Sequence, residues 1–278
     1  MDVLITGGAG TIGTAITDHL GDGEHSFTSL DVEEHPDDDV ESVVADATDA
    51  AVVREHVADA DAVVHLARVP MEVGGTSDQT VVWSDEHLEN LRLHASVYEA
   101  AIETGLDTLV YASSNHAVGM YEIENAPDIY YGSEFEVDHA VQPRPDSMYG
   151  VEKVYGEGLG RLAAEASDLA VYALRICAVR DPEYDHPYGD AQRGVDQGRF
   201  EPDSAAYDEQ VARMRCMWQS RRDIAHMVER CLADGSVEFD VFYGVSDNEN
   251  RWFDIDHARD VLGYDPRDSA DEWDAPPS

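Results

Sequence analysis

Two kinds of apolar pattern alternate along the chain. Short apolar runs, typical of buried strands, are separated by longer segments in which apolar residues recur every three or four positions, as on one face of a helix. We predict strands at Val3–Ile5, Phe27–Leu30, Ser42–Ala45, Ala62–Leu66, Thr108–Ala112, Ala170–Ile176 and Val237–Phe242. We predict helices at Thr11–Leu20, Ala50–Ala58, Leu88–Glu103, Met148–Glu165, Arg222–Leu232 and Ile255–Leu262. Strands separated by helices predict an α/β fold with a doubly wound parallel sheet, because each right-handed crossover needs about a helix of chain.

The alternation is interrupted after residue 176. We therefore predict a core over residues 1–176 and a smaller C-terminal region over residues 177–278. The segment Asp181–Tyr207 is rich in Gly, Pro, Asp and Tyr and shows no clean period, so we predict an ordered loop there.

The charge of the chain excludes several classes of partner. Its 278 residues include 59 Asp and Glu against 18 Lys and Arg, a formal net charge of −41. A field this negative repels phosphate backbones and anionic lipids, so we expect neither a nucleic acid nor a membrane surface as partner. No apolar run approaches the roughly 20 residues of a spanning helix, and the three cysteines fit no disulfide or zinc pattern. We expect a soluble, cytoplasmic protein without a metal site.

Lysine is nearly absent from this chain, since Lys153 is the only one and every other basic residue is arginine. Extreme acidity with so little lysine resembles proteins of a salt-accumulating, haloarchaeal cytoplasm, in which salt screens the repulsion between surface carboxylates. In such a chain a solitary lysine points to chemistry rather than to surface charge.

Three glycines stand between the first predicted strand and the first predicted helix. Gly7, Gly10 and Gly13 have the spacing G-x-x-G-x-x-G. This arrangement is typical of a turn that brings backbone close to the diphosphate of a dinucleotide, which the N–H groups at the helix N-terminus then bind. Thr11 and Ile12 open that helix and are expected to contact the cofactor.

The ends of the next strands supply candidates for the rest of the cofactor site. Asp31 ends the second strand, where a carboxylate would bind the ribose hydroxyls and repel a 2′-phosphate, so we predict NAD rather than NADP. Asp46, with Ala47, follows the third strand and either faces the adenine ring or is one more surface acid. Leu66 and Ala67 close the fourth strand on the same edge.

The single lysine has a tyrosine four residues before it. Tyr149 and Lys153 share one face of a predicted helix, so both can approach the same substrate and cofactor. The ammonium is expected to favour the phenolate form of the tyrosine, which then acts as a base. Ser113 and Ser114 end the fifth strand, at the edge of the sheet where ligands bind, and one of them is expected to hydrogen-bond the reacting oxygen.

These motifs together resemble the extended short-chain dehydrogenase/reductases of the NAD-dependent epimerase/dehydratase superfamily. The matching pieces are TGGAGTIG, Asp31, VVHLA, the helix NLRLHASVYEAA that Asn90 begins, YASSNHAVG, Tyr149-x-x-x-Lys153 and VLGYDP. The resemblance implies a Rossmann fold and selects Ser114, five residues before a glycine, as the catalytic serine. It also implies that Asn90 braces the lysine through water, and that the chain forms a homodimer through the helices Leu88–Glu103 and Met148–Glu165.

Two groups within the superfamily are similar to this chain in more detail. Ser114-Asn115-His116 and the Arg175 strand resemble the uronate dehydrogenases, whereas HPYGDAQRGVDQGRF and YDEQVARMRCMWQSRRD resemble the haloarchaeal NAD-dependent glucose-6-phosphate dehydrogenases. The resemblance implies oxidation of glucose 6-phosphate at its anomeric carbon to 6-phosphogluconolactone, with Asn115, His116 and Arg175 on sugar hydroxyls. A uronate dehydrogenase, with Arg175 on the substrate carboxylate, stays open. A nucleotide-sugar epimerase or dehydratase, and a non-catalytic NAD sensor, are weaker alternatives.

Positive charge is concentrated in one part of the chain. Residues 175–222 contain eight arginines against nine acids, whereas acids dominate everywhere else. Because arginine forks suit phosphate, we expect some of Arg193, Arg213, Arg215 and Arg222 to hold the anion of a sugar phosphate. The alternative is that these arginines form internal salt bridges or a subunit interface.

Overall fold

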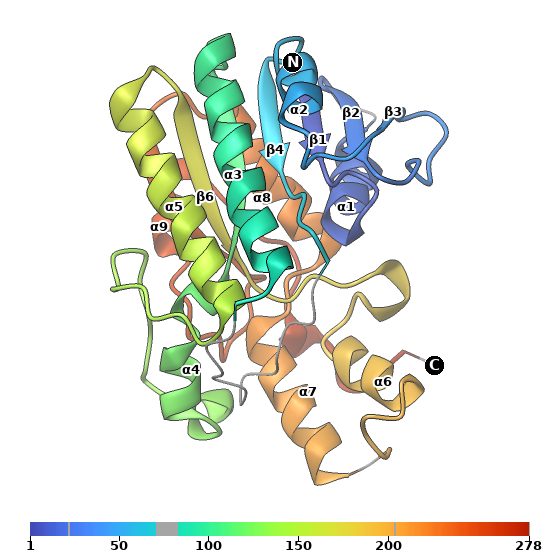
Figure 1. The fold of residues 1–278 in the computed structure, drawn as a ribbon. Coiled ribbons are helices and arrows are strands. Elements are labelled where there is room, and N and C mark those ends of the chain that lie inside the picture. The colour runs from blue at the N-terminus through green and yellow to red at the C-terminus, as the bar shows by residue number, and fades with distance from the viewer. Residues whose placement is uncertain (22, 71–82, 203, 278) are drawn as a thin grey trace.

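A parallel sheet forms the centre of the molecule. The computed structural model describes residues 1–21, 23–70, 83–202 and 204–277, and within them the sheet has the order β3-β2-β1-β4-β5-β6-β7 (Figure 1). Its strands are β1 (Asp2–Thr6), β2 (Ser26–Asp31), β3 (Glu41–Val44), β4 (Ala62–His65), β5 (Thr108–Ser114), β6 (Ala170–Ile176) and β7 (Phe239–Gly244). The chain winds outward from β1 to β3 and returns to β4 beside β1, so the prediction of a doubly wound parallel sheet is confirmed.

Helices cover both faces of the sheet because apolar residues alternate along each strand. Val3 and Ile5 pack with α1 (Thr11–Leu20), α8 (Arg221–Ala233) and α9 (Asp256–Leu262). Leu4 between them packs with α2 (Ala50–Val57), α3 (Asp85–Thr104) and α5 (Met148–Ala166) on the opposite face. This period of two is the pattern of a strand buried on both sides.

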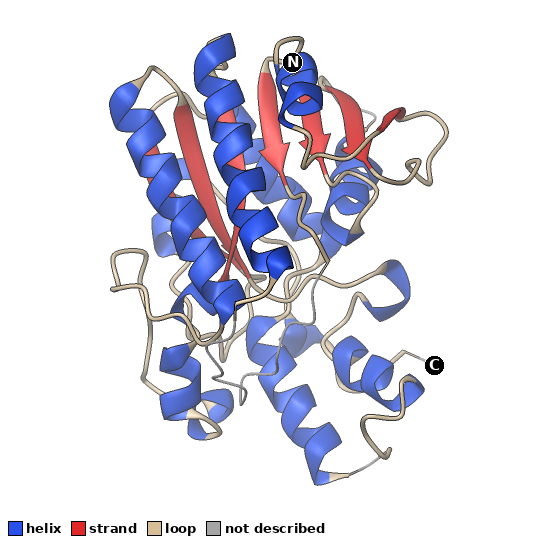
Figure 2. Cartoon of the chain, in the orientation of Figure 1, coloured by secondary structure: helices blue, strands red, loops and turns tan. Residues whose placement is uncertain are grey.

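A third group of elements lies beyond the carboxyl edge of the sheet (Figures 1 and 2). It contains α4 (Met120–Asn125), α6 (Gly189–Asp196) and α7 (Ala205–Met217), and its own core includes Val118, Tyr130, Met214 and Trp252. The prediction of a loop at Asp181–Tyr207 is wrong, because this segment holds a short 3₁₀ helix, α6 and the beginning of α7.

The C-terminal region also completes the sheet. Strand β7 pairs with β6, and helix α8 packs on α1, so residues beyond 176 contribute to both the sheet and its cover. A division of labour between residues 1–176 and 177–278 remains a prediction about function. Within the described part of the chain, no helix has the length and apolar character needed to cross a membrane.

Two histidines are buried beneath the carboxyl edge. The Thr6 hydroxyl lies 2.7 Å from His65 Nδ1, and His65 Nε2 lies 2.9 Å from His94 Nδ1. Both rings are 1% exposed, and burial, with a smaller contribution from the charge of Lys153, lowers the pKa of His65 to about 3. The native protein therefore keeps His65 neutral under conditions in which an unfolded chain would protonate it.

This difference predicts a specific acid sensitivity. As the pH falls below 6.5, the unfolded chain binds a proton that native His65 does not bind until about pH 3, so stability is lost across that window. Between pH 7.5 and 5, His65 should remove about 2 kcal/mol from the free energy of unfolding. Denaturant titrations at constant salt should show a correspondingly smaller pH slope for His65→Asn. The exposed His19→Asn should keep the wild-type slope, and equal slopes in all three proteins would contradict the assignment.

Candidate functional site

The site begins at the turn between β1 and α1, where the strand order reverses and ligands bind in such sheets. Gly7 has φ +76°, and its N–H donates to the Leu30 carbonyl at 2.8 Å. A Cβ on Gly7 would lie 2.8 Å from the backbone nitrogen of Ala67, so glycine alone lets the turn approach the end of β4. The N-terminus of α1 follows directly at Thr11.

A cavity of about 430 Å³ opens on one side of this turn. Its walls include these residues, all expected at the cofactor site: Gly7, Gly10, Asp31, Asp46, Ala47, Leu66 and Ala67. The Asp31 carboxylate is fixed at the end of β2, because it accepts hydrogen bonds from the backbone N–H groups of Ala9 at 3.1 Å and Val32 at 2.7 Å. The cavity therefore offers a carboxylate for ribose hydroxyls at the adenosine end of a dinucleotide.

A second cavity of about 360 Å³ shares walls with the first. The expected residues around it are Gly7, Gly10, Thr11, Ile12, Gly13, Leu66, Ser114, Tyr149 and Lys153. The glycine turn and Leu66 belong to both cavities, so together they form a cleft along the carboxyl edge of the sheet. An extended molecule with its diphosphate at the turn would reach Tyr149 with its other end.

Lys153 is held inside this cleft. Its side chain is 4% exposed, and Nζ donates to the Ala112 carbonyl at 2.8 Å. Nζ also lies 5.4 Å from the centroid of the Tyr149 ring and 5.3 Å from that of Tyr111. Burial lowers the pKa of Lys153; nearby Tyr149 opposes this fall, and the charge of Arg68 adds to it.

The two serines at the end of β5 have different partners. The Ser113 hydroxyl donates to Glu157 Oε1 at 2.6 Å. Ser114 Oγ accepts from the His116 N–H at 3.2 Å and lies 3.4 Å from Asn115 Oδ1, so it retains capacity for a substrate oxygen. Both serines line the second cavity, but the Ser113 hydroxyl is engaged by Glu157 of α5, so Ser114 is the one with capacity for a ligand.

His116 lies next to Tyr149. Its ring meets the Tyr149 ring edge-on, with 5.5 Å between centroids, and its Nδ1 is 2.8 Å from Asp146 Oδ2. Asn115 beside it is 5% exposed. Asp146 was not anticipated from the sequence, where the only available signal is its place three residues before Tyr149.

Asn90, which is expected to brace the lysine through water, forms direct hydrogen bonds to the chain that follows β4. Asn90 is 1% exposed, its Oδ1 accepts from the Val69 N–H at 2.7 Å, and its Nδ2 donates to the Val69 carbonyl at 3.2 Å. Its amide therefore fixes the chain that follows β4 and makes no direct hydrogen bond to Lys153. The same segment carries Arg68, which sequence reasoning missed as a site residue. Arg68 lines both cavities, with its guanidinium carbon 5.2 Å from the centroid of the Tyr149 ring.

The structure does not support the expected sugar contact from Arg175. Arg175 is 2% exposed and forms a two-pronged ion pair with Glu157, with both distances 2.9 Å, while its third nitrogen donates to the Tyr243 hydroxyl at 3.0 Å. Its guanidinium is therefore part of the interior. The same pairing counts against Arg175 as the residue that holds a substrate carboxylate.

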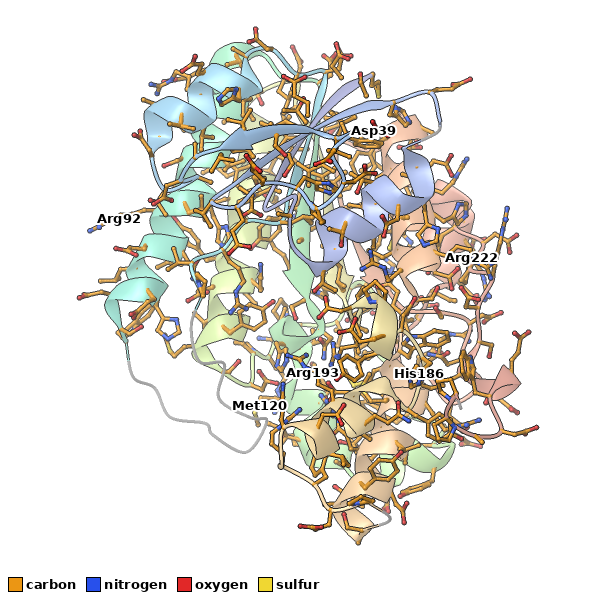
Figure 3. The ribbon with its side chains drawn as sticks, turned by 90° about the vertical axis from the view of Figure 1, so that its right-hand side faces the viewer. Asp39, Arg92, Met120, His186, Arg193 and Arg222 are labelled. Carbon is orange, nitrogen blue, oxygen red and sulfur yellow. The ribbon has the colours of Figure 1, made fainter. Side chains whose placement is uncertain are left out.

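Three of the four arginines expected to hold an anion likewise form ion pairs within the protein. Arg213 pairs with the buried Glu122, and Arg215 donates to the Trp273 carbonyl and lies 3.7 Å from Asp271. Arg222 pairs with Asp268 on the outside of α8, well apart from Arg193 (Figure 3). Of the four candidates, Arg193 alone forms no ion pair with another described residue. Internal salt bridges, the alternative explanation of the cluster, account for the other three.

Comparison with known proteins agrees with this geometry. The model of the NAD dependent epimerase/dehydratase family matches residues 3–194. The chain belongs to this family. NAD-dependent glucose-6-phosphate dehydrogenase of Haloferax volcanii is 34% identical, over 98% of this chain and 95% of that protein. L-arabinose 1-dehydrogenase (NAD(P)(+)) of the same organism is 31% identical, over 96% and 97%. A crystal structure of a mutant uronate dehydrogenase from Agrobacterium tumefaciens complexed with NAD is 26% identical, with a TM-score of 0.72 over 100% of this chain and 91% of that one.

The protein is thus an NAD-dependent sugar dehydrogenase, and its cleft fits the cofactor. The absence of a side chain at Gly7 lets a diphosphate approach the backbone of the turn, and Asp31 lines the cavity at the adenosine end. When bound, NAD supplies the hydride acceptor. At the other end of the cleft, Tyr149 could take a hydroxyl proton in its phenolate form, which the nearby Lys153 ammonium would stabilise, and Ser114 could hydrogen-bond the same oxygen.

Removing the phenol should separate catalysis from cofactor binding. In Tyr149→Phe the ring remains but the proton acceptor is lost, so kcat should fall by about 10²- to 10⁴-fold. The dissociation constant for NAD, measured by titration calorimetry, should change little. Tyr155→Phe on the exposed side of the same helix is the matched control and should retain wild-type kcat. Turnover that survives in Tyr149→Phe would show that another group is the base.

Proposed function

We propose that this dehydrogenase oxidises C1 of a hexose phosphate, converting glucose 6-phosphate to 6-phosphogluconolactone. Tyr149 takes the proton of the anomeric hydroxyl, the C1–H bond breaks with its electron pair going to the nicotinamide of NAD, and C1 becomes the lactone carbonyl. The observation that carries this proposal is that Ser114, Tyr149 and Lys153 line one cavity, which shares the glycine turn with the cavity that contains Asp31. In the proposal, Asn115 and His116 hold sugar hydroxyls.

The phosphate part of the proposal rests on Arg193 and on the relative from Haloferax volcanii, which is named for glucose 6-phosphate. Arg193 belongs to α6, in the group of helices beyond the carboxyl edge, and its guanidinium has no carboxylate partner among described residues. The planar fork of such a guanidinium suits phosphate oxygens.

A uronate dehydrogenase is the second candidate function, and the similarity to a uronate dehydrogenase structure supports it. The pairing of Arg175 with Glu157 weakens this candidate, because it removes the residue expected to hold the carboxylate. The two candidates share the oxidation at C1 and differ only in the anion at the far end of the sugar.

Substrate comparison tests the proposal. Steady-state rates with NAD should be measured for glucose 6-phosphate, glucose, glucuronate, galacturonate and L-arabinose. Glucose 6-phosphate should exceed glucose in kcat/KM by about 10- to 100-fold, the effect of one or two charge-assisted hydrogen bonds. Arg193→Gln should remove most of this advantage without changing kcat/KM for glucose, whereas Arg222→Gln, whose side chain is paired with Asp268, should have no effect. Activity confined to a uronate would refute the phosphate assignment and leave the oxidation at C1 intact.

We also propose that the chain forms a homodimer through α3 and α5. These helices pack side by side on one face of the sheet (Figure 1), and several of their outward side chains are apolar. The exposed ones are Leu88, Ile102, Val151, Tyr155 and Leu162. Burial of such a patch would stabilise association, since exposed apolar patches mark contact surfaces.

Sedimentation velocity tests the dimer. The wild-type protein should have a mass twice the chain mass of 30.6 kDa, and Leu162→Glu, which places a charge at the most exposed of these residues, should be a monomer. Val32→Glu changes an apolar side chain that is 65% exposed, directly after β2 and outside this set of residues, and should remain dimeric. A monomeric wild-type protein would refute the proposal.

The charge composition supports a further part of the proposal, that the enzyme acts in a salt-rich cytoplasm. Its 59 carboxylate residues repel one another strongly at low ionic strength. Concentrated salt screens this repulsion and favours the compact state.

A further inference from the structure

A histidine and a carboxylate form a buried pair beside the catalytic tyrosine. Both carboxylate oxygens of Asp146 face the His116 ring, with Oδ2 2.8 Å and Oδ1 3.0 Å from Nδ1. The Asp146 side chain is 1% exposed, whereas that of His116 is 21% exposed. The pair therefore has an inner end, which is the carboxylate, and an outer end, which is the imidazole next to Tyr149.

Several features of the chain hold this pair in place. The Asp146 N–H donates to the His116 carbonyl at 3.4 Å, and the Ser147 hydroxyl donates to Asp146 Oδ1 at 2.8 Å. Two glycines leave the necessary space. A Cβ on Gly119 would lie 2.0 Å from Asp146 Oδ2, and a Cβ on Gly150 would lie 2.3 Å from the His116 carbonyl oxygen. The backbone is thus shaped to admit the carboxylate at this point.

The pairing fixes which nitrogen of the ring carries the proton. Carboxylate oxygens only accept hydrogen bonds, so Nδ1–H of His116 is the donor. In the neutral ring Nε2 then has a lone pair and no hydrogen, and it makes no hydrogen bond to another described residue. The free nitrogen of a partly exposed ring beside Tyr149 is therefore an acceptor.

We infer that Asp146 is a positioning residue, which holds His116 in the Nδ1–H form so that Nε2 accepts a hydrogen bond from a sugar hydroxyl beside the reacting carbon. The inference rests on the proposed oxidation of a sugar at this site and goes beyond it by assigning the direction of a hydrogen bond. With the other tautomer, Nε2–H would point a donor at the hydroxyl, and the hydroxyl proton would have no acceptor there. The same logic applies to other histidines whose tautomer a buried carboxylate fixes.

Nuclear magnetic resonance tests the tautomer directly. In wild-type protein labelled with ¹⁵N at histidine, and at a pH where the His116 ring is neutral, Nδ1 should be protonated and Nε2 bare. Assignment uses His116→Gln, which removes the signal. In Asp146→Asn the amide can also donate to Nδ1, so the Nε2–H form should gain population. A wild-type ring with its proton on Nε2 would overturn the inference.

A double-mutant cycle tests the consequence for catalysis. Asp146→Asn and His116→Gln should each lower kcat/KM by roughly 10- to 100-fold. Because Asp146 acts through His116, adding Asp146→Asn to His116→Gln should lower kcat/KM by less than about twofold. Losses that multiply would show that the carboxylate acts independently of the histidine, and would overturn the inference.

Three controls keep a structural effect apart from a positioning effect. NAD affinity and the thermal midpoint should be wild-type in Asp146→Asn. Asp146→Glu, which retains the carboxylate, should recover part of the lost kcat/KM. It also takes the place of Asp146→Asn in the cycle if that variant does not fold. Asp138→Asn changes an exposed carboxylate and should be neutral. The cycle is run with whichever sugar gives the highest rate, so a uronate substrate would refute the hexose phosphate assignment without affecting the coupling between Asp146 and His116.

Discussion

The burial of one ammonium group constrains the centre of this enzyme. Moving a charge out of water is unfavourable unless nearby groups replace the lost hydration. Lys153 donates one hydrogen bond to the Ala112 carbonyl and lies close to the rings of Tyr111 and Tyr149. Its remaining N–H groups are directed by this arrangement towards the cleft, where ligand oxygens can accept them.

These contacts depend on close packing between β5 and α5. The carbonyl that binds Lys153 comes from β5, two residues before Ser114, and Tyr149 lies one helical turn before Lys153 on α5. A shift of either element would therefore separate the serine, the tyrosine and the lysine from one another. The catalytic set is a consequence of how one strand and one helix pack, and the conformation of a single loop does not determine it.

The acidity of the chain affects its interior as well as its surface. Glu122 and Glu157 are both buried, and each forms an ion pair with an arginine, Arg213 and Arg175 respectively. A buried carboxylate without such a partner would be strongly destabilising, so these arginines are required where they are. The concentration of arginine in residues 175–222 does indicate anions around these side chains, but most of those anions are carboxylates from other parts of the protein.

The limits of sequence reasoning follow from the same facts. Strands, the glycine turn and the Tyr149–Lys153 spacing are local patterns, and the sheet was predicted from them. Helix α6 was missed because it has two glycines and only a few small buried residues, so packing rather than an apolar stripe determines it. The partners of Arg213 and His116 lie 91 and 30 residues away in the sequence, and no local pattern identifies such pairs.

The C-terminal region also shapes the cofactor site, although the glycine motif lies at the other end of the chain. Arg221, 4% exposed, donates to the Thr11 carbonyl at 2.9 Å and pairs with Asp18 at 2.6 Å, while Asp181 accepts from the Thr11 hydroxyl. Residues from beyond 176 thus hold the first turn of α1, whose N–H groups face the diphosphate position. Because this turn is anchored from both ends of the chain, the cofactor cleft and the C-terminal region form one packed unit, and displacement of α8 would disturb the cofactor turn directly.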